Sequence, residues 1–246
     1  MLSNKYIFVY STILVVVAAS ILSIAAVVLK PFQQKNQEVE KMQQLLSSVG
    51  IASEADNAEE LYNKYFTEEY GVNPEGEIVS SYINQQQTKG SERPFKADMK
   101  KELQKVKSND SSASLPVFVC NKDGKKNYVV PVSGAGLWGG IWGYMAVDED
   151  LSTVVGVNFG HKSETPGLGA EITTEKFQNQ FKGKQVFENS QVKLEVKKRA
   201  DKQDKYQVDA ISGATITSTG VSNMIKDCLG LYIKYFETIK TDSNGK

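Results

Sequence analysis

The fold class follows from the stretch LPVFVCNKDGKKNYVVPV, which occupies residues 115–132. Two runs rich in Val, Phe and Tyr, Leu115–Cys120 and Asn127–Val132, flank an Asp-Gly pair at positions 123 and 124. Asp-Gly is a preferred pair for a two-residue hairpin turn, because both turn positions need a positive φ angle. The stretch therefore predicts two antiparallel strands joined by a tight turn.

A second hairpin is predicted further along the chain. The apolar runs Ile141–Val147 and Val154–Phe159 surround the acidic segment Asp148–Asp150. Three carboxylates between two strands are typical of a solvated turn, so no metal site is assigned to them.

The remainder of the chain adds one more strand pair and a helix. Val192–Lys198 and Tyr206–Ile211 are predicted to be strands, and apolar residues repeat every three or four positions in Val221–Thr238, which predicts a helix capped by Ser218 or Thr219. The predicted fold class is α+β, with a mainly antiparallel sheet packed with helices and one N-terminal transmembrane helix.

The N-terminal segment predicts a membrane anchor. Tyr6–Leu29 holds 24 residues without a charge, bracketed by Lys5 and Lys30. At about 1.5 Å per residue a helix of this length measures about 36 Å, more than the roughly 30 Å of a hydrocarbon core. A cleaved signal peptide is the alternative, but its apolar region is usually shorter. Lys5 and the terminal amine balance Lys30 and Lys35, so charge bias does not set the orientation.

Three domains are predicted: a transmembrane anchor (1–30), a helical stalk or N-terminal part of the soluble region (31–114) and a C-terminal domain (115–246). Pro31 is expected to end the first helix. Further helices are expected at Ala55–Tyr70 and Phe95–Lys107, with a short strand at Ile78–Ile83. Whether residues 31–114 form a separate lobe is left open.

Composition excludes some classes of function. The 246 residues contain 29 Lys and Arg and 29 Asp and Glu, so the formal net charge is zero and nothing indicates a nucleic-acid partner. Cys120 and Cys228 do not have the spacing of metal ligands; they could pair, although two buried thiols are favoured.

The stretch Asp209–Thr215 (DAISGAT) combines small residues with hydroxyls ahead of an apolar helical run. Gly213 can adopt a positive φ angle, and the hydroxyls of Ser212 and Thr215 could hold a phosphate. An ordinary helix cap and turn explains the same residues, and composition does not separate the two interpretations.

The motif formed by Asp209, Ser212, Gly213, Ala214 and Thr215 resembles the D-x-x-(S/T)-G-A-T signature of FMN-binding domains. In that family a flavin transferase links FMN to the last threonine through a phosphoester. The resemblance implies that FMN is the cofactor, bound covalently to Thr215, and that the transferase is a partner during maturation.

Two further motifs carry the same resemblance. The stretch HKSETPGLG (161–169), with Thr165, Gly167, Leu168 and Gly169, is similar to the family's H-x-E-T-P-G-L-G loop. It has one additional residue between His and Glu, so His161 is given no role. Gly136-Leu137-Trp138 resembles the G-x-G-L-W segment of one branch, the C subunits of sodium-pumping NADH:quinone oxidoreductases. This implies that Leu137, Trp138, Thr165 and Leu168 lie against the flavin ring.

The resemblance implies an electron carrier in the bacterial inner membrane, spanning it once, with a periplasmic flavin domain. It would be one of six subunits that couple NADH oxidation to sodium export, with no complete active site and no catalytic residue on this chain alone. Two alternatives are kept: the equivalent subunit of an Rnf-type ferredoxin-linked complex, and a membrane-anchored scaffold domain that carries no flavin.

Overall fold

The computed structural model describes residues 3–244, which form two units that meet between Lys41 and Met42. The first unit consists of helix α1 (Asn4–Ser48) as far as Lys41. Among the described residues, α1 is the one helix long and apolar enough to cross a membrane, with a mean hydropathy of 2.8 in its most apolar window and none of that window buried. This agrees with the predicted anchor.

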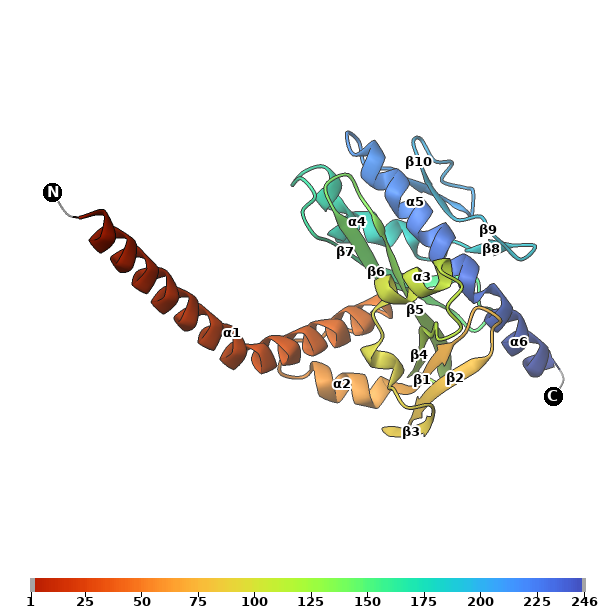
Figure 1. Ribbon diagram of the computed structural model, residues 1–246. Coiled ribbons are helices and arrows are strands. Elements are labelled where there is room, and N and C mark those ends of the chain that lie inside the picture. Colours follow the sequence, from red (N-terminus) through yellow and green to blue (C-terminus); the bar gives the residue numbers. More distant parts are fainter. Residues whose placement is uncertain (1–2, 245–246) are drawn as a thin grey trace. The chain divides into compact units, whose positions relative to one another are not determined.

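The prediction that Pro31 ends the first helix is wrong, because α1 continues through Pro31 to Ser48 (Figure 1). A proline inside a helix removes one backbone hydrogen bond but does not always break the helix. The last turns of α1 bury Met42, Leu45 and Leu46 in the second unit, and this burial stabilises the continued helix.

The second unit is built on a seven-stranded antiparallel sheet with strand order β3-β2-β1-β4-β5-β6-β7. Its strands are β1 (Phe66–Val72), β2 (Ile78–Ile83), β3 (Gln86–Lys89), β4 (Leu115–Lys122), β5 (Lys125–Ala135), β6 (Gly140–Val147) and β7 (Val154–His161). Both predicted hairpins, β4–β5 and β6–β7, are confirmed. The turn at Asp123 and Gly124 has φ angles of 52° and 78°, as the Asp-Gly pair requires.

Two small pairs of strands complete the sheet structure. β8 (Phe187–Glu188) and β9 (Gln191–Val192) are antiparallel, whereas β10 (Glu195–Lys197) and β11 (Gln207–Asp209) are parallel. The last pair corresponds to the two strands predicted ahead of the DAISGAT stretch.

The predicted helix Ala55–Tyr70 is too long. Helix α2 (Ala58–Tyr65) ends at Tyr65 and the chain continues as β1, which pairs with β2 on one side and β4 on the other. Tertiary pairing overrides local helical periodicity here. The pairing of β1 with β4 also joins strands from both sides of the predicted division at Leu115 into one sheet, while the division itself stays a prediction.

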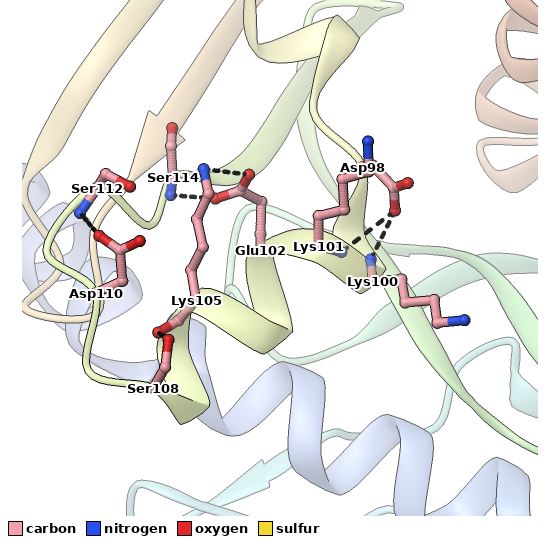
Figure 2. A network of polar contacts seen from close by, with 9 residues as sticks. All are labelled: Asp98, Lys100, Lys101, Glu102, Lys105, Ser108, Asp110, Ser112 and Ser114. Atoms are coloured by element: carbon pink, nitrogen blue, oxygen red, sulfur yellow. Dashed lines mark hydrogen bonds and ion pairs between the residues drawn. The ribbon is translucent and has the colours of Figure 1, made fainter.

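Helix α3 (Met99–Lys107) follows a short 3-10 turn, η1 (Pro94–Lys96). Figure 2 shows how polar groups fix its ends. The carboxylate of Asp98 accepts hydrogen bonds from the backbone N–H groups of Lys100 and Lys101, as an N-cap should. Glu102 accepts from the backbone N–H of Ser114 at 2.7 Å and so connects α3 to the start of β4.

The C-terminal helix starts earlier than predicted. Helix α5 (Thr215–Leu229) begins at Thr215, and a 3-10 turn, η4 (Gly230–Tyr232), separates it from α6 (Ile233–Asn244). The shorter elements between the sheet and α5 are η2 (Gly169–Thr173), α4 (Glu175–Gln178) and η3 (Asn179–Phe181).

The sheet is covered on both faces. Leu115–Cys120 of β4 is buried throughout, because alternate side chains point to opposite faces and each face has a cover. On one face Val130, Val132 and Met145 join the apolar residues of α5 in the main core. The other face carries a chain of ring contacts from Tyr62 through Phe95 and Phe118 to Tyr144. Helix α5 is thereby held against the sheet.

Candidate functional site

The DAISGAT stretch forms a tight turn that leads directly into α5. The backbone N–H of Ala214 donates to the carbonyl of Ile211 at 3.1 Å, and Gly213 has a φ angle of +78°. Ala214 is the N-cap residue and Thr215 the first residue of the helix. The predicted capping by Ser218 or Thr219 is therefore wrong. Ser218 instead accepts a 3.1 Å hydrogen bond from the backbone N–H of Ile211, which closes the turn.

The N-terminus of α5 has backbone donors available for a ligand. In the described part of the chain no side chain caps this helix. The first backbone hydrogen bond of the helix runs from the N–H of Ser218 to the carbonyl of Ala214 at 2.9 Å. The N–H groups of residues 215–217 therefore come before the regular helical hydrogen bonds. Together with the positive end of the helix dipole, these donors favour an anion such as phosphate.

The hydroxyls of α5's first turns lie in different environments. Thr215 is exposed, as is Thr219 one turn later. The side chain of Thr217 is only 1% exposed, and its hydroxyl donates a 2.7 Å hydrogen bond to Oε2 of Glu164. A hydroxyl already bonded to a buried carboxylate is inaccessible to another protein, whereas that of Thr215 is open to solvent.

Glu164 connects the Trp138 segment and the 161–169 loop to the first turn of α5. It is 5% exposed, and its Oε1 accepts a 2.8 Å hydrogen bond from the backbone N–H of Trp138, while its Oε2 accepts from Thr217. Its own backbone N–H donates to Nδ1 of His161 at 3.1 Å. The sequence places Glu164 within the 161–169 motif, but we predicted no role for it there. The signal that could have found Glu164 is a carboxylate between the predicted strand Val154–Phe159 and the Pro166-Gly167 bend.

Glycines let the three loops approach closely. A Cβ at Gly213 would lie 2.8 Å from Cδ2 of Leu168, so the turn and the 161–169 loop are in contact. A Cβ at Gly169 would lie 2.8 Å from the hydroxyl oxygen of Thr217, and a Cβ at Gly136 would lie 2.5 Å from Oε1 of Glu164. Gly136, Gly169 and Gly213 therefore stand where a larger residue would push the loops apart.

Large apolar side chains remain exposed on these loops. Trp138 is 65% exposed, Leu137 49% and Leu168 40%, and Ile216 on the first turn of α5 is 59% exposed. Ile216 was not among the predicted site residues. Its place directly after the threonine is the signal that could have found it. An exposed apolar surface beside an anion-binding helix end suits a ligand that has both a phosphate and a flat ring.

The remaining predicted site residues hold the loops in place. The Asp209 carboxylate accepts a 2.9 Å hydrogen bond from the backbone N–H of Ala200, so it fixes the segment before the turn. The carbonyl of Thr165 accepts from the N–H groups of Leu168 and Ala170, and Gly167 has a φ angle of +75°. The exposed side chain of Ser212 lines a cavity of about 660 Å³ shared with Asp209.

The described residues do not include a group of three or more His, Cys, Asp or Glu side chains that could hold a metal ion. Glu164 and His161 are engaged in the contacts that join the loops. The arrangement is therefore suited to holding a cofactor at the surface, and its chemistry depends on that cofactor.

Comparison with known proteins gives concordant matches. Residues 136–230, which span all three motifs, match the FMN-binding domain family. The chain is 32% identical to the C subunit of Na(+)-translocating NADH-quinone reductase from Haemophilus ducreyi, over 89% of this chain and 86% of the relative. It is 33% identical to the corresponding protein from Pasteurella multocida, over 89% of each chain.

Solved structures agree in fold. The crystal structure of the Na(+)-translocating NADH-quinone reductase C subunit from Parabacteroides distasonis has a TM-score of 0.71 and 40% sequence identity, and the match covers 85% of this chain and 96% of the other. That of the Shewanella oneidensis protein has a TM-score of 0.67 at 24% identity, covering 83% of this chain and 99% of the other, and supports the fold alone.

Proposed function

Because this chain belongs to the family of C subunits of Na(+)-translocating NADH-quinone reductases, we propose that Thr215 carries FMN through a phosphoester bond and that the chain relays electrons between the other subunits. The chain is a subunit of that reductase, with an FMN-binding domain and an apolar N-terminal helix suited to a single membrane anchor. The proposal goes beyond this family membership in three respects: the covalent bond to FMN, its position at Thr215, and the relay of electrons between subunits.

The residues present fit FMN. The amides at the start of α5 and the exposed hydroxyl of Thr215 suit the phosphate. Gly213, two residues before Thr215, has no side chain, and its turn lies against Leu168. Bound FMN supplies the capacity to accept and release electrons.

The observation that carries the proposal is the contrast between the two threonines of the SGATIT segment. Thr215 is exposed at the first position of α5, whereas Thr217 is buried and donates its hydroxyl to Glu164. A separate transferase has to reach the hydroxyl that it modifies, so accessibility favours Thr215 over Thr217. The FMN phosphate and this hydroxyl would join with the net loss of one water.

The ring of FMN is assigned to the exposed apolar surface of the loops, formed by Leu137, Trp138, Leu168 and the backbone at Thr165. An open surface suits electron transfer between protein subunits, because a partner's cofactor can come close to the ring. The covalent bond then retains a cofactor that a shallow site would release.

A flavin transferase is the proposed maturation partner, and the FMN-binding domain is proposed to be periplasmic with α1 as the uncleaved anchor. The orientation is supported by the resemblance to the family and not by charge bias, since Lys5 and Lys30 lie on opposite sides of the apolar segment. The domain division proposed is 1–30, 31–114 and 115–246.

Intact mass tests the proposal directly. The full chain, coexpressed with a flavin transferase and its partner subunits, is expected to gain the mass of FMN less one water and to fluoresce as a flavoprotein after denaturing electrophoresis. Peptide mapping should place the gain on the peptide that bears Thr215.

Variants identify the acceptor. Thr215→Ala should abolish the covalent flavin. Thr219→Ala, a matched control because Thr219 is also exposed on α5, should retain it, and so should Thr217→Ala. Covalent flavin on the Thr215→Ala chain would show that another residue is the acceptor. An unmodified wild-type chain, in cells where a known acceptor protein is modified, would support a scaffold domain without flavin.

A further inference from the structure

We infer that Glu164 is a positioning residue that locks the Trp138 loop to the first turn of α5 and thereby sets the environment of the flavin. The inference rests on the proposed attachment at Thr215, because it concerns the surroundings of a flavin held there. Glu164 acts through the groups that it holds and makes no direct bond to Thr215.

The first step of the argument is that Glu164 has both carboxylate oxygens occupied by groups from different elements. Oε1 accepts from the backbone N–H of Trp138, in the β5–β6 loop, at 2.8 Å, and Oε2 accepts from the hydroxyl of Thr217, in α5, at 2.7 Å. A carboxylate is an acceptor with two separate oxygens, so it can join two donors that are not bonded to each other. Glu164 is therefore the bridge between the loop and the helix.

The second step is that the bridge is buried. Glu164 is 5% exposed and Thr217 is 1% exposed, so water does not compete freely for these bonds. Hydrogen bonds that involve a charged partner are shorter and stronger than neutral ones, and a buried donor or acceptor left without a partner is costly. The relative position of the Trp138 loop and α5 is therefore fixed more firmly than surface contacts would fix it.

The third step is that the carbonyl of Trp138 is also bonded by the 161–169 loop. Trp138 is 65% exposed, and its carbonyl accepts a 2.9 Å hydrogen bond from the hydroxyl of Ser163, the residue before Glu164. The 161–169 loop thus holds both the amide and the carbonyl of Trp138. A flavin ring held between Trp138 and Thr215 would therefore shift when the hydrogen bonds of Glu164 change.

Three variants separate the parts of the bridge. Glu164→Ala removes both bonds. Glu164→Gln keeps a similar shape and an oxygen for the Trp138 N–H, and its amide can donate to the Thr217 oxygen. Thr217→Val removes only the bond to the helix and keeps the bond to Trp138. Glu175→Gln is the matched control, because Glu175 is an exposed glutamate on α4.

The first measurement does not require flavin. In the full, unflavinylated chain, hydrogen exchange of the peptide that spans Ala135–Gly140 should become faster in Glu164→Ala by at least tenfold at the Trp138 amide. It should be close to wild type in Glu164→Gln and in Glu175→Gln. Exchange that is unchanged in a folded Glu164→Ala chain would overturn the bridge itself.

The second measurement uses the flavinylated chain and a property that a purely structural residue would not change. Glu164→Ala and Thr217→Val should both alter the flavin midpoint potential and the visible absorption spectrum, with Glu164→Gln closer to wild type than Glu164→Ala. If Glu164→Ala does not fold, Thr217→Val and Glu164→Gln still decide the question. Faster exchange with an unchanged potential and spectrum in all variants would overturn the positioning role.

The two proposals fail in different ways. A wild-type chain that takes up no flavin would contradict the attachment at Thr215, yet the exchange measurement would still test the bridge. A flavinylated chain whose Trp138 amide is insensitive to Glu164→Ala would contradict the bridge and leave the attachment intact.

Discussion

The hydroxyl of Thr217 donates a 2.7 Å hydrogen bond to Oε2 of Glu164, a residue 53 positions earlier in the chain. Both residues are buried, whereas Thr215, only two positions before Thr217, is exposed. Successive hydroxyls of one short motif therefore have separate roles, one inside the protein and one at its surface.

Stability measurements should show this separation. Thr217→Val leaves the carboxylate of Glu164 short of a donor and is expected to lower the free energy of unfolding by about 1–3 kcal/mol. Thr215→Val should change it by less than about 0.5 kcal/mol, since the side chain is exposed. Urea unfolding of the full chain in detergent, followed by circular dichroism, compares the two. Equal losses would contradict the separation.

Gly213 combines a positive φ angle with a close neighbour. Gly213→Ala should destabilise the fold by roughly 1–2 kcal/mol from the strained backbone and also push Leu168 aside, because the new Cβ would lie 2.8 Å from its Cδ2. Gly183→Ala is the control, since Gly183 also has a φ of +78° but no atom within 4 Å of a new Cβ. Both variants should lose similar stability in thermal unfolding, and only Gly213→Ala should change the flavin spectrum.

Two ion pairs on adjacent residues of β1 should differ in strength. Glu69 is 1% exposed and is bonded by Arg93, by the hydroxyl of Tyr62 and by the backbone N–H of Phe95. Arg93→Ala leaves this carboxylate without its cation and is expected to cost about 3–5 kcal/mol.

The control is Lys126→Ala, which removes the partner of the neighbouring residue Glu68. In that pair the side chains are 48% and 20% exposed, so the expected loss is about 0–1 kcal/mol. Denaturant midpoints at constant salt measure both variants. A small loss for Arg93→Ala would show that Tyr62 and the backbone satisfy Glu69 without the ion pair.

The thiols should be unreactive in the native state. Cys120 and Cys228 are free and buried, which confirms the favoured prediction, and burial raises the pKa of Cys228 from 9.0 to about 11 and that of Cys120 to about 12. At pH 8.5 a two-unit rise lowers the thiolate fraction about 100-fold, so alkylation by iodoacetamide should be slower by about that factor or more than in urea.

The sign of the linked stability follows from the same shifts. Well below pH 9 both the folded and unfolded chains keep these thiol protons and the contribution is constant. Between pH 9 and about 11 the unfolded chain loses them first, so the thiols should lower stability as pH rises. Mass spectrometry after timed alkylation measures the reactivity; fast labelling of native Cys228 would contradict its burial.

Trp138 is expected to affect the flavin and not the fold. Its side chain is 65% exposed, so Trp138→Ala should leave the unfolding midpoint nearly unchanged while it alters the flavin spectrum and slows electron transfer, with the covalent bond retained. The comparison is Trp142→Phe on β6, the second of the two tryptophans. An unchanged flavin spectrum and rate in Trp138→Ala would remove this contact from the proposed site.

Much of the fold could be predicted because its signals are local. The hairpin turn at Asp123 and Gly124 needs only two neighbouring residues, and the apolar length of Tyr6–Leu29 needs no tertiary information. The failures are non-local. Residues 66–70 have helical periodicity but pair with β4, and Pro31 stays within α1, whose later turns are buried. Neither pairing nor burial is visible in a short window of sequence.

The site shows the same limit. The three motifs can be located because their residue types are unusual, but the contact between Glu164 and Thr217 depends on folding, and Ile216 lies ahead of the predicted helix Val221–Thr238, where the sequence gives it no role. The sequence places the start of α5 too late because the hydroxyls of Ser218 and Thr219 resemble caps, while the actual N-cap, Ala214, offers no side-chain acceptor.

Two glycines at the interface between α5 and the sheet have a consequence for the proposed electron relay. A Cβ at Gly220 would lie 2.3 Å from the carbonyl oxygen of Ala135, and one at Gly134 would lie 2.8 Å from Cβ of Met224, so helix and sheet approach each other closely at both glycines. Electron tunnelling slows exponentially with distance, and the close approach at these two glycines leaves the helix little room to move toward the sheet there. For the flavin proposed on Thr215, this close approach would narrow the spread of tunnelling rates that thermal motion of the helix would otherwise cause.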